Sequence, residues 1–377
     1  MWSLYRFVSI FGCAFMAMGL FANENIPPCS EFCTCGEFCN DNAKSRTPKS
    51  DKHSLLLLYE NDSNFNPHID RYYTAGVALK FHSKDLLQNQ TSKHRTRFYA
   101  FMNAISLPSF FAKYLQKYDE NALFAPSFGI AMSQEIYAPK DKFSNPPPSG
   151  DYPYSGFLYT SVVLQNRFKY IVEQFEAQIG IVGKAALAKQ TQDFIHEARN
   201  VRKLAGWDTQ LKNEGIFNMY YRLSFSLPKV YEKSKSLLDI MPQASFGLGN
   251  AKIYAQANLI ARIGYNLIPN TFTPTINSGF VSAMKHSFDF SVEAYAGVGI
   301  RAVVRNMFLQ GNSFLPRNDI DLSRGVGEFI WGVSLNYKRF FVAYTGLHPT
   351  REFSNQDGGG GLSGIHTIGS IIVGGNF

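Results

Sequence analysis

Residues 72–82 read YYTAGVALKFH, and two kinds of side chain alternate along this stretch. One set runs from Tyr73 to Phe81 in two-residue steps and is otherwise aliphatic, whereas the other set includes Thr74, Lys80 and His82. Successive side chains of a β-strand point to opposite faces, so this alternation predicts a strand whose faces meet different surroundings. We expect the face with Thr74 and Lys80 to line a polar lumen and the other face to meet lipid.

The same alternation recurs along the chain, for example at residues 170–181, 254–265 and 288–301. Soluble β-sandwiches alternate as well, so the pattern by itself only favours a membrane barrel over a sandwich. An even number of strands lets a barrel close with both termini on one side of the membrane. Twelve strands are expected, at residues 54–60, 72–82, 123–137, 154–168, 170–182, 216–227, 238–248, 254–265, 287–308, 328–338, 340–348 and 364–377.

The two ends of the chain strengthen the barrel interpretation. Residues 1–22 have a short basic start, an apolar run and a small residue, Ala22, as secretory signal peptides do. Residues 364–377, GIHTIGSIIVGGNF, end on an aromatic residue and resemble the terminal strand of bacterial outer-membrane barrels. The predicted fold is therefore all-β, a transmembrane antiparallel β-barrel of about twelve strands at residues 53–377, with a short helix in an external loop.

Residues 23–52 are predicted to form a Cys-rich periplasmic tail. In an oxidising compartment its crowded cysteines suggest two local disulfides, with three possible connectivities. A metal site is the alternative, although the spacing matches no common zinc pattern. The cysteines are Cys29, Cys33, Cys35 and Cys39.

The net charge of +8 is spread along the chain without a basic run of the kind that binds nucleic acid. Two interpretations stay open. Either the basic residues attract phosphorylated lipid at a cell surface, or they cap the ends of strands. No nucleic acid partner is expected, and no protein partner is evident from the sequence.

The predicted topology sorts the connections between strands into two groups. If both termini are periplasmic, residues 61–71, 138–153 and 183–215 lie outside the cell. Residues 83–122 then form a long periplasmic insertion with helical pieces. Residues 184–206 have helical propensity and lack strand alternation. On such a helix one polar face would hold Gln192, His196, Arg199 and Lys203.

Several polar residues at the outer rim are candidates for a functional site. Asn61 and Asp62 follow the first strand, and Thr74 lies near the start of the second. Alone, each is an ordinary turn or strand residue, but three oxygen-bearing side chains at one rim suit a hard cation such as calcium. His196 is either an exposed loop histidine or a general base. A loop lysine is normally solvated, but it can also stabilise an oxyanion; the candidates are Lys140 and Lys142.

Spaced motifs carry a family resemblance across residues 54–377. They are END at residues 60–62, YTAGV at 73–77, QEIYAP at 134–139, G-D-x-x-Y-S-G at 150–156, and the histidine segment before Trp207. In this order they resemble the outer-membrane lipid A 3'-O-deacylase family. The resemblance is strongest before Trp207.

The resemblance implies a twelve-stranded barrel that removes the 3'-linked acyl group of lipid A in the outer leaflet, with a site facing outward. It implies a calcium (Ca2+) requirement, with the metal near Asp62 and Thr74. The family's active-site residues fall at Asn61, Asp62, Thr74 and His196, and its lysine falls at Lys142 or Lys140.

One position departs from the family. The family has an acidic residue after the histidine, but this chain has Arg202 at that position. We expect Glu197 or Asp193 to take the place of the acid.

Other functions remain as alternatives to the deacylase. An outer-membrane phospholipase is a related enzyme, and a non-enzymatic porin or surface barrel belongs to another class. A covalent serine route would use Ser63 or Ser155 next to His196, although the chain has no G-x-S-x-G motif.

Overall fold

The computed structural model describes a single compact unit within residues 46–377. The predicted signal peptide, nearly all of the Cys-rich tail and the loop at residues 63–70 lie outside the described part. No helix in the described part is long and apolar enough to cross a membrane. The described residues are 52–62, 71–86, 93–107, 125–168, 171–198, 200–226, 231–233, 236–267, 272–273, 289–317, 319–354, 356 and 366–377.

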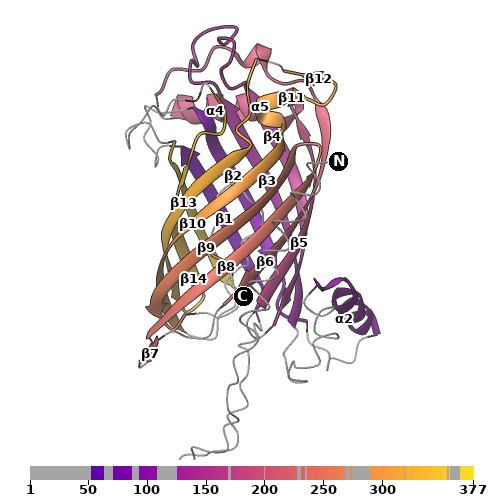
Figure 1. The fold of residues 1–377 in the computed structure, drawn as a ribbon, viewed down its shortest axis with the longest axis vertical. Coiled ribbons are helices and arrows are strands. Elements are labelled where there is room, and N and C mark those ends of the chain that lie inside the picture. Colours follow the sequence, from indigo (N-terminus) through magenta and orange to yellow (C-terminus); the bar gives the residue numbers. More distant parts are fainter. Residues whose placement is uncertain are drawn as a thin grey trace, which may run out of the picture. The chain divides into compact units, whose positions relative to one another are not determined.

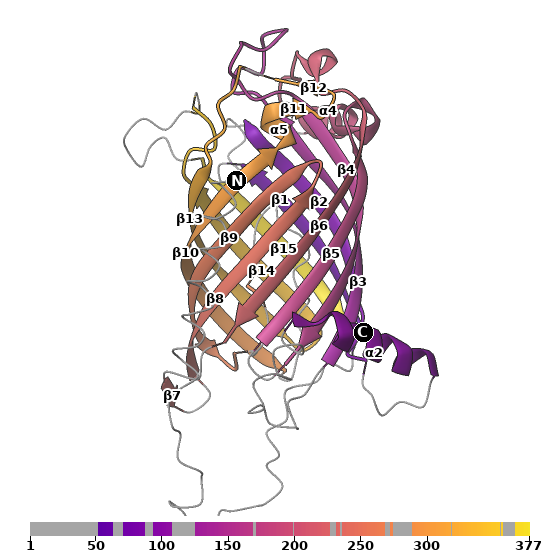
Figure 2. The same cartoon turned by 45° about the vertical axis from the view of Figure 1, so that its right-hand side comes forward.

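Twelve antiparallel strands form a closed barrel (Figures 1 and 2). Each strand pairs with its neighbour along the chain, and β15 pairs with β1 to close the sheet. The prediction of a twelve-stranded barrel is confirmed. The strands are β1 (Ser54–Asp62), β2 (Tyr72–His82), β3 (Ala125–Ala138), β4 (Ser155–Arg167), β5 (Ile171–Val182), β6 (Glu214–Phe225), β8 (Ser236–Gly249), β9 (Lys252–Tyr265), β10 (Phe290–Asn306), β13 (Gly325–Tyr337), β14 (Phe340–Pro349) and β15 (Ile368–Asn376).

Short helices and strands lie at the two ends of the barrel. At one end, which we call the outer end, Figure 1 shows α4 (Ala188–Ala198), α5 (Met307–Gln310) and the hairpin of β11 (Gly311–Asn312) and β12 (Leu315–Pro316). The helix α2 (Lys93–Ile105) lies at the opposite end, where the insertion was predicted. The remaining short elements are β7 (Tyr231–Lys233), η2 (Lys184–Ala186) and η3 (Trp207–Thr209).

The two faces of the wall differ as the alternation predicts. Along β1 buried and exposed residues alternate, and Leu57 is 48% exposed while Glu60 is buried. Met132 and Ile179 are also well exposed on the outward face. Polar residues such as Lys80 point inward and are buried. An apolar exterior around a polar interior is the arrangement of a transmembrane barrel.

A register shift in β2 corrects one expectation. The pairing of β2 with β3 slips between Tyr73 and Ala75, as in a β-bulge. The strict alternation placed Tyr73 outward and Thr74 in the lumen. Instead, the Tyr73 hydroxyl donates to the carboxylate of Glu60 inside the barrel. A single extra residue therefore changes which side chains face the lumen at the outer end of β2.

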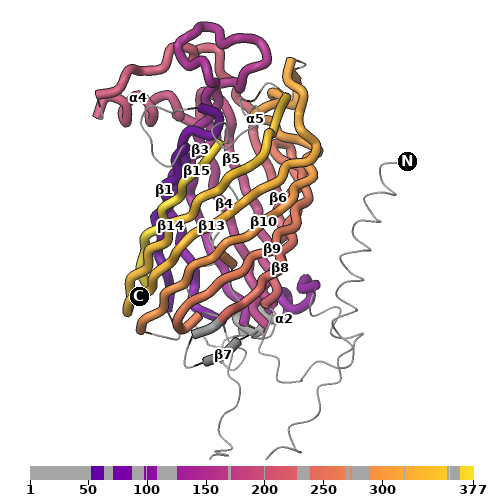
Figure 3. Tube along the Cα trace, turned by 60° about the vertical axis from the view of Figure 1, so that its left-hand side comes forward, coloured from indigo at the N-terminus to yellow at the C-terminus, as the bar shows by residue number. Residues whose placement is uncertain are grey.

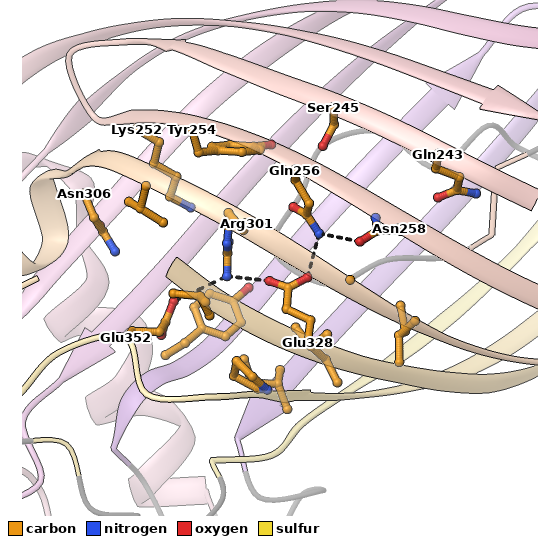
Figure 4. Close-up of a pocket in the computed structure, with 18 of the residues that line it drawn as sticks. Gln243, Ser245, Lys252, Tyr254, Gln256, Asn258, Arg301, Asn306, Glu328 and Glu352 are labelled. Carbon is orange, nitrogen blue, oxygen red and sulfur yellow. Dashed lines mark hydrogen bonds and ion pairs between the residues drawn. The ribbon is translucent and has the colours of Figure 1, made fainter. Parts of the chain in front are cut away.

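The outer end of the lumen is filled by side chains. Met307 and Phe308 of α5 are fully buried, and the Phe308 ring stacks on Tyr137 with 4.2 Å between centroids. Tyr137 also lines a cavity of about 90 Å³, which has room for several water molecules. In it Arg301 pairs with Glu328 at 2.6 Å, as Figure 4 shows. The lumen is thus obstructed rather than open.

Candidate active site

Asn61 and Thr74 meet at the outer end of the wall. The Asn61 amide nitrogen donates to the backbone carbonyl of Thr74 at 2.8 Å. The Thr74 hydroxyl in turn donates to the carbonyl of Ile136 at 3.1 Å. These two bonds join the ends of β1, β2 and β3. The structure therefore brings together two of the residues predicted to share a site.

Asp62 ends β1 beside Asn61 and is fully buried. Its carboxylate accepts a hydrogen bond of 2.7 Å from the Arg71 amide, which spans the ends of the loop between β1 and β2. Because the Thr74 hydroxyl donates its proton to Ile136, its oxygen presents lone pairs to any cation nearby. A carboxylate and a hydroxyl are oxygen ligands that calcium accepts, so the donor types suit that metal, with Asp62 on the buried face of β1 that also carries Glu60. The described residues hold no group of three or more His, Cys, Asp and Glu side chains arranged for a metal.

A cluster on the outward face connects this rim to α4. We call it the outer-wall cluster: Ala75, Ile136, Ala138, Tyr154, Ala188, Leu204 and Trp207. Gly156 allows the close approach, since a Cβ there would lie 2.4 Å from the Ala188 Cβ. Figure 3 shows α4 beside the upper ends of the strands, outside the barrel. The helix therefore covers the lipid-facing side of the wall and not the lumen.

The helix is shorter than the sequence suggested. It ends at Ala198 rather than near residue 206, and Asn200 adopts the left-handed conformation with a φ of 56°. The Val201 amide then donates to the His196 carbonyl at 2.8 Å. Lys203 is therefore not on the helix face where it was predicted, and Arg199 lies outside the described residues.

His196 lies on the buried face of α4. Its Nδ1 is 2.8 Å from the backbone carbonyl oxygen of Arg202. A carbonyl only accepts, so Nδ1 carries the proton and Nε2 is the basic nitrogen of the neutral ring. The turn after α4 thus fixes both the orientation and the tautomer of the histidine.

The two acids expected to assist His196 have other partners. Glu197 pairs with Lys203 at 2.9 Å, and that hydrogen bond raises the pKa of Lys203. Asp193 contacts Lys189, four residues earlier on the exposed side of the helix. The ring is contacted instead by the backbone carbonyl of Arg202, the residue that stands at the sequence position of the family acid.

Gln192 and Trp207 have a role that sequence reasoning missed. Gln192 is one turn before His196 and is also buried, and its side-chain oxygen accepts from the Trp207 indole at 3.0 Å. Trp207 itself packs on Tyr154 in the outer-wall cluster. The i, i+4 spacing of Gln192 and His196 was the sequence feature that could have indicated this role, because residues so spaced share a helix face.

The structure separates the two candidate lysines. The Lys142 carbonyl accepts from the Tyr154 hydroxyl at 2.7 Å and from the Ala205 amide at 3.1 Å. Its ammonium lies 6.0 Å from the Phe143 ring, over which the Arg202 guanidinium sits at 4.2 Å. These contacts connect Lys142 with the segment that holds His196.

Lys140 has different surroundings. It is exposed, and its amide donates to Asp151 at 3.0 Å within its own loop. The neighbouring Asp141 orders the loop further: the hydrogen bond from the Ser144 hydroxyl lowers the pKa of that carboxyl.

Ser155 faces the wrong way for a nucleophile. It shares the lumen side of β4 with Phe157, whereas Gly156 between them touches α4 on the outside. The wall therefore separates the Ser155 hydroxyl from His196. The other candidate, Ser63, lies outside the described residues.

Comparison with known proteins decides the family. The family model described as outer membrane protein LpxR matches residues 14–371. The chain belongs to the LpxR family. Members are outer-membrane β-barrels that act as lipid A 3'-O-deacylases, which are ester hydrolases. The predicted family and location are therefore confirmed.

One solved structure supports the fold. LpxR from Salmonella typhimurium aligns with a TM-score of 0.63 and 18% identity, over 86% of this chain and 100% of that one. The β domain of the Bordetella autotransporter BrkA aligns with a TM-score of 0.42 and 8% identity, over 87% of this chain and 100% of that one. No curated protein matches the chain.

Proposed function

We propose that this chain hydrolyses the 3'-linked acyl ester of lipid A in the outer leaflet, with His196 as the general base. Membership of the LpxR family supplies the reaction and substrate. The observation that carries the assignment of His196 is its position. It is a buried histidine on α4, on the lipid-facing side of the wall, with Nδ1 bonded to the Arg202 carbonyl.

The geometry supports general base catalysis followed by general acid catalysis. With its proton on Nδ1, His196 takes a proton from water at Nε2, and the resulting hydroxide attacks the ester carbonyl carbon. The Nε2 proton is then transferred to the sugar oxygen as the carbon–oxygen bond breaks. Such proton transfer contributes on the order of 10² to 10⁴ in rate. The bond to Arg202 stabilises the ring while its charge changes.

The rim residues stabilise the charge that develops on the ester oxygen. Asn61 and Lys142 are the proposed donors, and each well-placed donor contributes roughly 3 kcal/mol. Asp62 and Thr74 would hold calcium, which when bound supplies positive charge to polarise the ester carbonyl. Lys142 is preferred to Lys140 because its contacts lead to the segment around His196.

The alternative functions receive less support. An open porin does not fit a lumen obstructed by Met307 and Phe308. A phospholipase would use similar chemistry on a different lipid, and the substrate assay distinguishes it.

Mass spectrometry of lipid A tests the proposal. Cells producing the wild-type chain are expected to lose the mass of the 3'-linked acyl group, and cells producing His196→Ala are expected to retain it. Glu197→Ala is the matched control, because Glu197 is the next helix residue and its carboxylate pairs with Lys203. Equal amounts of folded barrel must be compared. Unchanged lipid A with the wild type, or full deacylation with His196→Ala, would contradict the proposal.

A further inference from the structure

The side of α4 that faces away from the wall carries two exposed apolar residues. Leu187 directly precedes the helix and is 50% exposed, and Phe194, seven residues later, is 74% exposed. The buried residues Ala188, Gln192 and His196 occupy the opposite side. We call Leu187 and Phe194 the apolar edge of α4.

Packing within the described residues does not explain this edge. Phe194 is the most exposed large apolar side chain in the part of the chain that the structure describes. Leu187 has a φ of 58°, a left-handed conformation that glycine or asparagine adopts more readily than leucine. A bulky apolar residue is thus held in a strained conformation with half of its surface exposed. Exposure alone does not identify the environment of the edge, because Phe314 in the β11–β12 hairpin is 64% exposed as well.

The depth of the edge along the wall identifies that environment. The Gln134 side chain, on the outward face of β3, donates to the Ala186 carbonyl at 2.7 Å, and Leu187 is the next residue. Met132 lies two residues further along β3 on the same face and is 60% exposed in the lipid-facing band. Two residues of a strand span only about 7 Å. The start of α4 is therefore attached immediately beside the apolar band.

We propose that the apolar edge of α4 inserts among the acyl chains at the surface of the outer leaflet. The edge is continuous with the lipid-facing wall through Gln134 and Met132, so its partner is the acyl-chain layer rather than another protein. Insertion holds α4 at the membrane boundary with His196 between the helix and the wall. The lipid contact stands independently, whereas its value for catalysis rests on the proposed function.

Fluorescence quenching by lipids with brominated acyl chains tests the insertion. Tryptophan replaces Phe194, and the signal of the wild type, including that of Trp207 and Trp331 in the barrel, is subtracted. Ile179→Trp provides the lipid-facing standard, because Ile179 is 67% exposed on the wall. Phe314→Trp provides the aqueous standard, because Phe314 is 64% exposed in the β11–β12 hairpin at the outer end (Figure 1).

The expected result is that Phe194→Trp is quenched as strongly as Ile179→Trp, while Phe314→Trp responds only to an aqueous quencher such as iodide. Quenching of Phe194→Trp by iodide alone would overturn the proposal. Protection from both quenchers would also overturn it, because the edge would then be covered by protein.

A second experiment addresses the consequence for catalysis. Phe194→Asp is expected to slow deacylation of lipid A in bilayers by about tenfold or more, with a smaller loss in detergent micelles, whereas Phe194→Leu retains the activity. Equal rates for Phe194→Asp and the wild type in bilayers would overturn the catalytic consequence. If the wild type itself releases no acyl chain, the proposed function fails, but the quenching result still decides the insertion.

Discussion

The lumen and the outer wall beside α4 both bury polar side chains, but their partners differ. In the lumen, Glu135 accepts from two tyrosines and lies 3.5 Å from the Lys252 ammonium. On the outer wall, His196 and Asn61 bond to backbone carbonyls. Side chains that satisfy one another stabilise a barrel, whereas side chains oriented by the backbone are held in one orientation toward a substrate. The face of the wall on which a buried polar side chain lies therefore indicates its function better than the number of buried charges does.

The largest effect on stability is expected from the lumen. Arg262 is almost fully buried and contacts Asp239 at 2.8 Å and Glu293 at 3.2 Å. Arg262→Met leaves these carboxylates without that cation and should destabilise the barrel by about 3 to 5 kcal/mol. Urea unfolding in bilayers measures the loss, with the exposed Arg324→Met as the control. The deacylation rate per folded barrel should stay close to that of the wild type; a rate loss of a hundredfold would place part of the site in the lumen.

The two candidate lysines lie on the outer side of the wall and differ in their expected effect on catalysis. Lys142→Ala should raise the barrier to ester hydrolysis by roughly 3 kcal/mol, because an oxyanion donor is lost. Lys140→Ala is the matched control in the same loop and should leave the rate nearly unchanged. Deacylation rates of the two variants, measured with purified protein and lipid A, test both expectations. A larger rate loss with Lys140→Ala than with Lys142→Ala would assign the oxyanion role to Lys140. It would contradict the assignment based on the contacts of Lys142 and Arg202 with Phe143.

A smaller, pH-dependent effect is expected at His366, just before β15. Burial, together with the charge of Arg71, lowers the pKa of His366 to about 3. The folded barrel therefore keeps this histidine neutral while the unfolded chain protonates it below about pH 6.5. Stability contributed by the neutral ring is present above pH 6.5 and is lost progressively as the pH falls toward 3, by about 2 kcal/mol at pH 5.

His366→Leu removes this titration. Unfolding free energies at pH 7.5 and pH 5 should therefore differ less for the variant than for the wild type. An equal difference in the two proteins would show that His366 is not held neutral. The deacylation rate of His366→Leu at pH 7.5 provides the control. It should match that of the wild type, since His366 packs on Tyr72 near the lumen.

The architecture was predictable because one side chain in two must meet lipid. That requirement leaves a period of two in the sequence, from which twelve strands and their inner faces follow. The bulge at Tyr73–Ala75 could not be predicted, because it leaves the local composition unchanged while shifting the register. The end of α4 at Ala198 was also missed, since Asn200 adopts a left-handed conformation within a stretch of good helix formers.

The candidate site was only partly predictable for a related reason. Asn61 and Thr74 were placed at one rim by strand register, and the structure joins them. The partner of His196 is a backbone carbonyl, and every residue has one, so no residue type marks Arg202 for that role. Glu197 and Asp193 carried the expected charge, but the helix turns them toward lysines instead.

The most direct test compares one change on each side of the wall. His196→Gln alters the outer side, and Glu135→Gln alters the lumen, while each replacement keeps a polar side chain of similar size. Release of the 3'-linked acyl group from lipid A is measured for equal amounts of closed barrel. A catalytic site on the outer side of the wall predicts that His196→Gln loses on the order of 10² or more in rate, whereas Glu135→Gln stays within a few-fold of the wild type. A large loss with Glu135→Gln and near-normal release with His196→Gln would contradict it, because the reaction would then belong to the lumen.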